Sequence, residues 1–205
     1  MIDKFCNFVK KLSLEFGNLP EEFNYDNPVL ILVDAVLSIN RRYNEFVVPR
    51  IELMRGENIK TLEELKQKIE DLDKDGFCKF WNYNHPDRVR MLSDLTDKFL
   101  RIKKEFKLSD DLQVLHKWGE QSKVSDFQDF NIRGIGFTTF QYLRLLCKAD
   151  TTKPDRHVLR AIKDGIGQDL FGTEAVCIIE KAAKKLNIPV RQLDYALWKH
   201  YSENI

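Results

Sequence analysis

The sequence predicts an all-α protein. Apolar residues recur every three or four positions through most of the 205 residues, which is the spacing that places side chains on one face of a helix. Asp, Ser or Thr precedes several of these segments, as is typical of helix starts. No segment shows the alternation of apolar and polar residues that indicates a β-strand. Many short helices are therefore expected, in one large domain or in two small lobes that share a cleft.

The first two helices are predicted from apolar spacing and from the residues at their ends. One apolar stripe runs from Phe5 to Phe16, and Gly17-Asn18-Leu19-Pro20 is expected to end that helix. Asn27-Pro28 begins the next helix, because proline is tolerated in a first turn. Residues 29–37 are apolar almost throughout. This second helix should therefore be buried on more than one side.

The later helices are predicted in the same way. Thr61-Leu62-Glu63-Glu64 is a capping box, so a third helix runs from there to about Leu72. Asn187-Ile188-Pro189 separates the last two helices. The other helices are expected at 75–83, 87–105, 109–119, 123–130, 138–148, 156–164, 173–186 and 190–202.

Composition excludes several classes of protein. Hydrophobic residues make up 43% and charged residues 32% of the chain, a balance that is ordinary for a globular protein and argues against disorder. No run approaches the roughly 18 apolar residues that span a membrane, and the N-terminus lacks a signal pattern. A cytoplasmic, nucleoid-associated protein without membrane contact is expected.

Cysteine and histidine are scattered along the chain, and no C-x-x-C pair is present. Neither a disulfide framework nor a zinc site is predicted. No cofactor and no side-chain metal site are expected, and the thiols should be buried and reduced. The residues concerned are Cys6, Cys78, Cys147, Cys177, His85, His116, His157 and His200.

Charge is distributed unevenly around a formal net charge of +1. Residues 131–165 carry seven basic and three acidic side chains, whereas residues 57–75 carry four basic and seven acidic ones. The basic segment could bind phosphates locally. Its charged residues could equally be ordinary side chains on the solvent-exposed faces of helices.

Gly134-Ile135-Gly136 predicts a tight turn that opens a helix. Two glycines around one apolar residue allow positive φ angles and leave backbone N–H groups uncovered. The helix that starts near Thr138 adds its positive dipole end, so the turn can hold a phosphate without reading base sequence. Ile132 and Ile135 should point into the protein. An ordinary helical corner is the structural alternative.

Three segments together resemble the helix-hairpin-helix DNA glycosylases, the superfamily of endonuclease III. Residues 132–140 are similar to the family pattern L-P-G-V-G-x-K-T-A, Asp155-Arg156-His157-Val158 is similar to D-T-H-V, and residues 36–43 are similar to a segment with L-L-S-A-Q. The resemblance implies two helical lobes with a cleft between them, next to Asp155. On this sequence, one lobe would comprise residues 1–24 and 154–205. The other lobe would comprise residues 25–153 and include the hairpin at about 124–148.

The resemblance implies that Asp155 is catalytic. Departure of a base from C1′ leaves an oxocarbenium-like sugar, whose positive charge a carboxylate stabilises, and the same group can activate water. Thr138 stands where bifunctional members carry the lysine that forms a Schiff base. A monofunctional glycosylase without lyase activity is therefore expected. Taken alone, Asp155 could also be a helix N-cap.

Other roles follow from the same resemblance. Asn40 stands at the position of the glutamine that fills the gap left by a flipped nucleotide, with Arg41 beside it. A left-handed helix C-cap is the alternative for Asn40. His157 would contact a phosphate or support the helix turn behind Asp155, and a packed structural histidine is the alternative that we favour. The residues expected to contact the DNA backbone are Arg133, Gly134, Ile135, Gly136, Thr138 and Thr139.

A base pocket needs aromatic side chains for stacking. Tyr43, Phe46, Trp81 and Tyr83 lie outside the clearest helical stripes, and we take Tyr43 and Trp81 as the pocket candidates. The aromatic residues expected in the core instead are Phe127, Phe130, Phe137, Phe140 and Trp198.

The family's iron–sulfur cluster requires four closely spaced cysteines near the C-terminus. Only Cys177 lies in that region, so no iron–sulfur cluster is expected. The resemblance also allows a monovalent cation held by the backbone carbonyls of the hairpin.

The function predicted from the sequence is that of a DNA-repair enzyme. A monomer would bind double-stranded DNA and hydrolyse the N-glycosidic bond of an altered or mispaired base. The first alternative is a non-catalytic DNA-binding or protein-interaction module on a degenerate glycosylase scaffold, for which Thr138, Lys153 and the near-neutral charge leave room. The second is a helical protein unrelated to DNA, in which Asp155 would lie far from residues 36–43.

Overall fold

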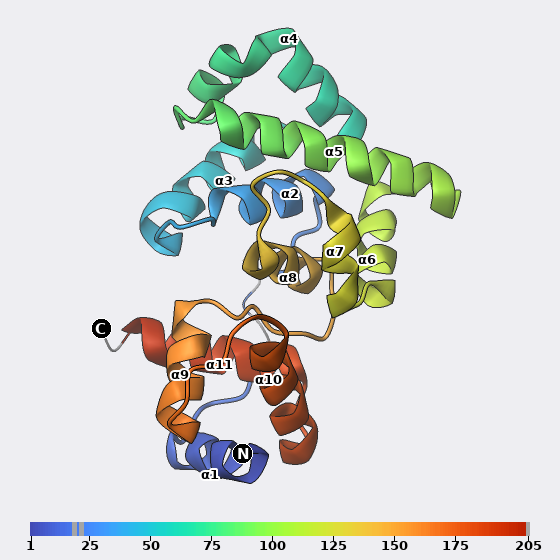
Figure 1. The fold of residues 1–205 in the computed structure, drawn as a ribbon. Coiled ribbons are helices and arrows are strands. Elements are labelled where there is room, and N and C mark those ends of the chain that lie inside the picture. Colours follow the sequence, from blue (N-terminus) through green and yellow to red (C-terminus); the bar gives the residue numbers. More distant parts are fainter. Residues whose placement is uncertain (18–19, 21–22, 204–205) are drawn as a thin grey trace.

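The computed structural model describes residues 1–17, 20 and 23–203, whose path is drawn in Figure 1. Within these residues the chain is helical and forms no β-strand, which confirms the predicted all-α class. The α-helices are α1 (Ile2–Lys11), α2 (Pro28–Leu37), α3 (Val48–Gly56), α4 (Leu62–Phe80), α5 (Pro86–Phe106), α6 (Asp111–Gln121), α7 (Phe127–Phe130), α8 (Phe137–Leu146), α9 (Arg156–Ile166), α10 (Gly172–Leu186) and α11 (Val190–Glu203). A π-helical turn, η2 (Tyr43–Val47), precedes α3, and a 3-10 turn, η3 (Val124–Asp126), precedes α7.

Local capping explains where several helices begin. The Asn27 side chain accepts a hydrogen bond of 2.9 Å from the Val29 N–H at the start of α2. Thr61 and Glu64 make both bonds of the capping box at the start of α4. Each side chain satisfies an N–H group that has no partner within its helix. The cap residues in the sequence therefore located these helix starts correctly.

The first helix is shorter than predicted. It ends at Lys11, and Ser13 adopts a left-handed backbone conformation with φ 49°. A left-handed residue cannot continue a right-handed helix, so Phe16 lies beyond α1, where its side chain is exposed. The predicted stop at residues 17–20 includes Asn18 and Leu19, which lie outside the described residues.

Residues 43–56 form helical structure that the sequence did not predict. Val47, Val48 and Pro49 lower helix propensity here, and no regular apolar stripe marks the segment. The proline falls in the first turn of α3, where its missing N–H costs nothing. Val47, Ile51 and Met54 are buried, so tertiary packing rather than local propensity holds these turns.

Helix α4 spans the two helices predicted at 61–72 and 75–83, and a kink between them keeps its two halves distinct. Its backbone departs from helical geometry at Asp73, which has φ 53° and ψ −174°. The Asp73 carboxylate accepts 2.9 Å hydrogen bonds from the N–H groups of Asp75 and Gly76. The second half of α4 therefore has its own cap at this kink.

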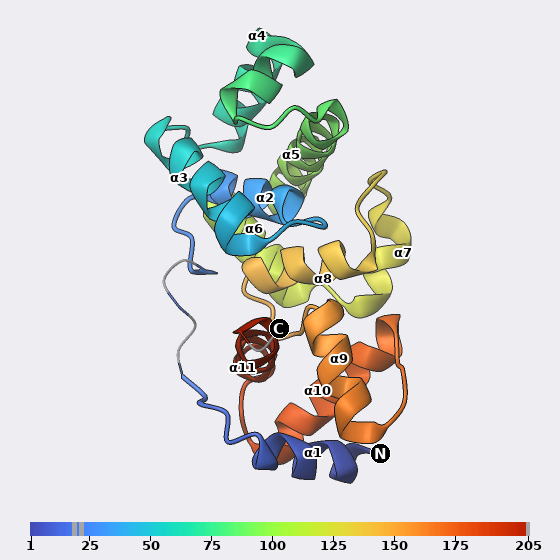
Figure 2. The same cartoon turned by 90° about the vertical axis from the view of Figure 1, so that its left-hand side faces the viewer.

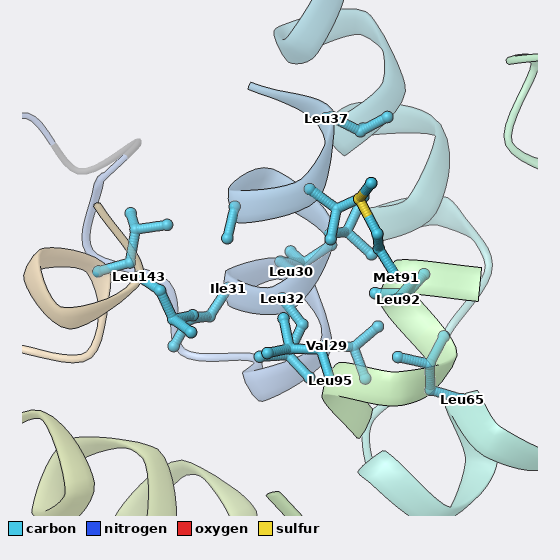
Figure 3. Packing of buried hydrophobic residues seen from close by; sticks show 14 of the residues in the cluster. Val29, Leu30, Ile31, Leu32, Leu37, Leu65, Met91, Leu92, Leu95 and Leu143 are labelled. Atoms are coloured by element: carbon cyan, nitrogen blue, oxygen red, sulfur yellow. The ribbon is translucent and has the colours of Figure 1, made fainter. Parts of the chain in front are cut away.

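Buried apolar side chains form two clusters. The larger comprises side chains from residues 23–147, and α2, all ten of whose residues are buried, runs through it. Figure 3 shows Ile31 of α2 near Leu143 of α8, and Val29 and Leu32 beside Leu95 of α5. The smaller cluster comes from α1, α9, α10 and α11. The first helix thus packs with the last three, as Figures 1 and 2 show, and residues 148–155 connect the two clusters.

Cys6, Cys78 and Cys147 are buried free thiols, as predicted, whereas Cys177 is only half-buried. Burial raises the pKa of the Cys147 thiol. In the part of the chain that is described, every helix is too short or too polar to cross a membrane.

Candidate functional site

The glycine-rich segment forms the predicted turn. The Ile135 N–H donates to the Ile132 carbonyl at 3.0 Å, and Gly134 has φ 95°. A Cβ at Gly134 would also lie 1.8 Å from Cε of Met91 on α5. Ile132 and Ile135 are 9% and 7% exposed, so both anchor the turn in the larger cluster, as predicted. Glycine is required at position 134 by its backbone conformation and by this packing.

The start of α8 offers backbone donors to solvent. Gly136 is its N-cap, no side chain caps it, and the first bond within the helix is from the Phe140 N–H to the Gly136 carbonyl. The N–H groups before Phe140 in this first turn therefore lack partners within the helix. The Ile135 N–H is already used inside the turn, and the predicted contact of this residue with the DNA backbone stays a prediction.

Arg133 is exposed at the tip of the turn. Its carbonyl accepts a 3.2 Å hydrogen bond from the Arg90 guanidinium of α5. Because this oxygen already accepts from a positively charged group, it is poorly suited to bind a monovalent cation. Among the described residues, no group of three or more His, Cys, Asp or Glu side chains is placed to hold a metal ion.

Asp155 is the N-cap of α9. Its Oδ1 accepts hydrogen bonds from the N–H groups of His157, at 2.9 Å, and Val158, at 3.3 Å. The N-cap interpretation is therefore confirmed. Both bonds end on Oδ1 and the residue is partly exposed, so capping is compatible with a second role for Oδ2.

The hairpin and the Asp155 segment are in direct contact. The Thr138 hydroxyl donates to the Pro154 carbonyl at 3.3 Å. Thr138 therefore supports the backbone beside Asp155. Its partly exposed neighbour Thr139 also lies in the first turn of α8.

His157 is a packed residue behind Asp155. It is 8% exposed, and its Nδ1 lies 3.2 Å from the Tyr201 carbonyl of α11. Nε2 accepts from the Arg156 guanidinium at 3.1 Å, which leaves Nδ1 to carry the proton. The imidazole is thus engaged on both nitrogens and holds the first turn of α9 against α11.

Asp194 of α11 supports the same segment and was not predicted from the sequence. Its Oδ1 accepts from the Thr152 hydroxyl and, at 2.8 Å, from the Lys153 N–H. Burial raises the pKa of the Asp194 carboxyl to about 7, and the negative charge of Asp155 acts in the same direction. A single acidic residue in a C-terminal amphipathic helix gives no sequence signal for this role.

Asp34 is a second buried carboxyl that sequence reasoning missed. The side chain is fully buried in α2, where it accepts hydrogen bonds from Tyr25 at 2.7 Å, Ser38 at 2.6 Å, Tyr43 at 3.2 Å and Tyr142 at 3.1 Å. Burial raises the pKa of the Asp34 carboxyl, while these hydroxyl donors oppose that rise. A lone acid within the apolar run 28–37 was the available signal, because a buried carboxyl requires partners.

Lys153 lies between the two buried carboxyls. Its Nζ is 3.5 Å from the centroid of the Tyr142 ring, and its positive charge lowers the pKa of both Asp34 and Asp194. Lys153 therefore links the segment before Asp155 to the tyrosines around Asp34.

Aromatic rings from both ends of the chain meet beside Asp34. Tyr43 stacks on Phe23 with centroids 5.2 Å apart, and both rings contact Trp198 of α11. Tyr195 stacks on Trp198 at 5.9 Å. Trp198 is therefore not the core residue that we predicted, because it is half-buried and faces Tyr43 rather than the smaller cluster.

Trp81 cannot line a pocket. Its side chain is fully buried, its indole N–H donates to the Tyr83 carbonyl at 2.9 Å, and its ring packs on Phe77. Phe130 and Phe140 are buried as predicted, whereas Phe127 and Phe137 are only partly buried. Of the two predicted pocket residues, only Tyr43 lies near the Asp34 tyrosines.

The loop after α2 carries the predicted wedge residue. Asn40 is exposed and left-handed with φ 56°, two residues after the actual cap, Ser38. The alternative of a left-handed C-cap is therefore correct for the backbone conformation of Asn40 but not for its position, because the C-cap Ser38 is right-handed. The wedge role stays a prediction. Arg41 donates to the Asn40 carbonyl at 3.1 Å and to the Tyr83 hydroxyl at 2.8 Å.

Two hollows in the described part of the chain lie away from Asp155 and Tyr43. One, of about 640 Å³, is bounded by α4, α5 and the residues that follow α5, and the other, of about 290 Å³, by the start of α4 and the two residues 58 and 59. Neither is lined by Asp155 or Tyr43. The rings beside Asp34 pack on one another.

Residues 129–202 match the model of a domain of unknown function (DUF8548). The matched segment covers less than half of the chain and contains the hairpin turn, α8, Asp155 and most of α11. No curated protein and no solved structure matches the chain. The turn and the candidate catalytic aspartate thus belong to one segment that recurs as a family.

Proposed function

We propose that this protein is a monofunctional DNA glycosylase with a two-lobed helix-hairpin-helix fold. The convergence of distant segments carries the proposal. Tyr142 of α8 donates to Asp34 of α2, and Lys153 lies over the Tyr142 ring. Thr138, at the start of α8, is bonded to the carbonyl of the residue before Asp155. Ser38 and Tyr43 also donate to Asp34 and so connect residues 36–43 to the hairpin helix and the aspartate segment, which argues against a chance likeness of three short motifs.

Asp155 would act through the oxygen that does not cap α9. Oδ1 is fixed by two backbone N–H groups, which leaves Oδ2 to face the sugar and the attacking water. As the base departs, the carboxylate stabilises the positive charge at C1′ and then accepts a proton from the water that adds there. The products are a free base and an abasic site in an intact strand.

Thr138 limits the reaction to hydrolysis. A threonine hydroxyl cannot form the Schiff base that a lysine amine forms with an abasic sugar. Its bond to the Pro154 carbonyl gives it a positioning role instead. The strand should therefore remain uncut after base release.

The test is a panel of labelled duplexes that carry alkylated, oxidised, deaminated or mismatched bases. We expect abasic sites with at least one class of base, revealed as strand breaks only after alkali. Borohydride should trap no covalent complex between protein and DNA. A trapped complex would contradict the monofunctional mechanism, and intact base in every duplex would contradict the glycosylase proposal.

In this proposal the start of α8 grips a DNA phosphate, and Gly136 allows a clean test. Its φ of −83° is close to that of proline, and a Cβ there would meet nothing within 4 Å. Gly136→Pro removes one N–H, whereas Gly136→Ala keeps it. We expect the proline variant alone to bind undamaged duplex several-fold more weakly, with a lower slope of log affinity against log salt concentration. Equal affinities of the two variants, measured by fluorescence anisotropy, would exclude Gly136 from phosphate binding.

A non-catalytic DNA-binding module is the second candidate. The packed rings of Phe23, Tyr43 and Trp198 favour it, because a flipped base would have to displace at least one of them. This candidate predicts duplex binding by a monomer with no base release from any duplex in the panel. Only the lesion panel distinguishes it from the enzyme, because both candidates are expected to be monomers.

A further inference from the structure

Three arginines surround the loop after α2 without carboxylate partners. Within the described residues, Arg41, Arg50 and Arg88 form no ion pair, whereas the nearby Arg42 pairs with Glu45. The three come from different parts of the chain: the loop itself, α3 and α5. Positive charge is thus concentrated at one place without local neutralisation.

Arg41 and Arg50 are held against one pair of aromatic rings. Phe46 and Tyr83 pack edge to face with centroids 4.8 Å apart. The Arg50 Cζ lies 3.7 Å from the Phe46 centroid, and the Arg41 Cζ lies 5.2 Å from Phe46 and 5.4 Å from Tyr83. Cation–π contacts of this kind favour arginine over lysine. Two of the aromatic residues first considered for a base pocket therefore support guanidinium groups.

Neutral acceptors fix the orientation of both groups. Arg50 donates to the Asn82 carbonyl at 3.0 and 2.7 Å and to the Phe46 carbonyl at 2.9 Å. Arg41 donates to one carbonyl and one hydroxyl, which engages two of its five N–H donors. Because the acceptors carry no charge, both guanidinium groups keep their attraction for an anion. Burial lowers the pKa of the Arg50 guanidinium, and the charge of Arg41 acts in the same direction.

Arg88 connects this loop to the hairpin turn. It is 9% exposed and donates to the Ile39 carbonyl at 3.2 Å and to the Met91 sulfur at 3.3 Å. Its Nε has no hydrogen-bond partner among the described residues. Met91 in turn packs against Gly134. Arg88 and Met91 therefore connect the loop that carries Arg41 to the hairpin turn.

We propose that Arg41 and Arg50 form a clamp for the backbone phosphates of a nucleic-acid strand that also contacts the hairpin turn. The clamp rests on the proposed function only in taking DNA as its ligand. Phosphates repeat along a nucleic-acid strand, so one strand can contact both the arginine pair and the hairpin turn. A single acidic side chain of a peptide could contact only one of these two sites. The rings hold the guanidinium groups in place before binding, which reduces the entropy lost when phosphate binds.

The clamp is tested by binding to undamaged duplex across a range of salt concentrations. Arg41→Gln and Arg50→Gln should each weaken binding several-fold and reduce the slope of log affinity against log salt by about 1, and the double variant by about 2. The effect should not depend on base sequence, since phosphate contacts carry none. Arg55→Gln is the matched control, because this arginine also lies on α3 but pairs with Glu52. It should bind as the unmodified protein does.

Folding and ligand class are controlled separately. Arg41 is exposed, so we expect Arg41→Gln to unfold at the same temperature as the unmodified protein. If Arg50→Gln is unstable, Arg41→Gln alone still tests the clamp. Unchanged DNA affinity and unchanged salt slope in Arg41→Gln would overturn the clamp. The clamp would also be overturned if Arg41→Gln lost binding to poly-glutamate but kept its affinity for DNA. Weaker DNA binding by the variants, together with a negative lesion panel for the unmodified protein, would support the clamp and reject the glycosylase. Absence of any DNA binding would reject both.

Discussion

Asp155→Asn is expected to slow base release by about 10²- to 10³-fold while duplex affinity stays unchanged. Asparagine is as good an N-cap as aspartate, so its Oδ1 can keep the two bonds from the first turn of α9. The variant therefore removes the negative charge and leaves the local fold intact. Single-turnover rates on the best duplex of the panel, with affinity from anisotropy, measure the two quantities independently.

Asp110→Asn is the matched control for this substitution. Asp110 caps α6 by accepting from the Gln113 N–H at 2.8 Å, and it is exposed. The same chemical change at an N-cap with no proposed catalytic role should leave base release unchanged. If Asp155→Asn released base at the unmodified rate, the mechanism would be wrong and Asp155 would be a cap alone.

Asp194→Asn should stabilise the fold increasingly as pH rises from about 4 to about 7. The pKa of Asp194 is raised from 3.8 to about 7 by burial, so the folded state retains a proton that the unfolded state loses within this window. Its contribution to stability is thus greatest below the unfolded pKa and is lost as pH approaches the folded pKa. Asparagine does not titrate, and its oxygen can still accept from Thr152 and Lys153. Each pH unit of the window changes the free energy of unfolding by about 1.4 kcal/mol. Above pH 7 we therefore expect Asp194→Asn to be more stable than the unmodified protein by on the order of a few kcal/mol.

Urea unfolding at pH 5 and pH 8 measures this difference directly. Asp3→Asn is the control of opposite sign, because a hydrogen bond from Lys185 lowers the pKa of the Asp3 carboxyl. Stability from that exposed pair is present above the unfolded pKa of Asp3 and is lost as pH falls through its folded pKa, so removing it cannot help at high pH. A stability difference between Asp194→Asn and the unmodified protein that is independent of pH would contradict an abnormal pKa for Asp194.

Most of the fold could be predicted because the signals are local. The apolar run of α2 and the cap at Thr61 each depend on residues no more than a few positions apart. The failures occurred where local signals are weak or misleading. Residues 43–56 are helical because Val47, Ile51 and Met54 are buried, and the predicted stripe to Phe16 continues past the left-handed Ser13.

The candidate site was predictable only in part. The turn at Gly134 and the N-cap at Asp155 follow from residue type and sequence position, and both are observed. Trp81 was misassigned because a sequence does not say which aromatic residues a core encloses, and this ring is fully buried. The arginine pair was missed for a related reason, since Phe46 and Tyr83 lie on different elements that only the folded chain brings together.

The sequence by itself determined most of the helices, the caps at Asn27, Thr61 and Asp155, and the glycine turn. The tertiary structure alone decided which charged side chains have partners. Tyr142 reaches Asp34 across 108 positions, and Asp194 reaches Lys153 across 41. Helical periodicity and capping act within a turn or two of chain. Burial of a carboxylate or a guanidinium instead depends on partners that any part of the chain can supply, and for this reason the neighbours of Asp155 became known only from the fold.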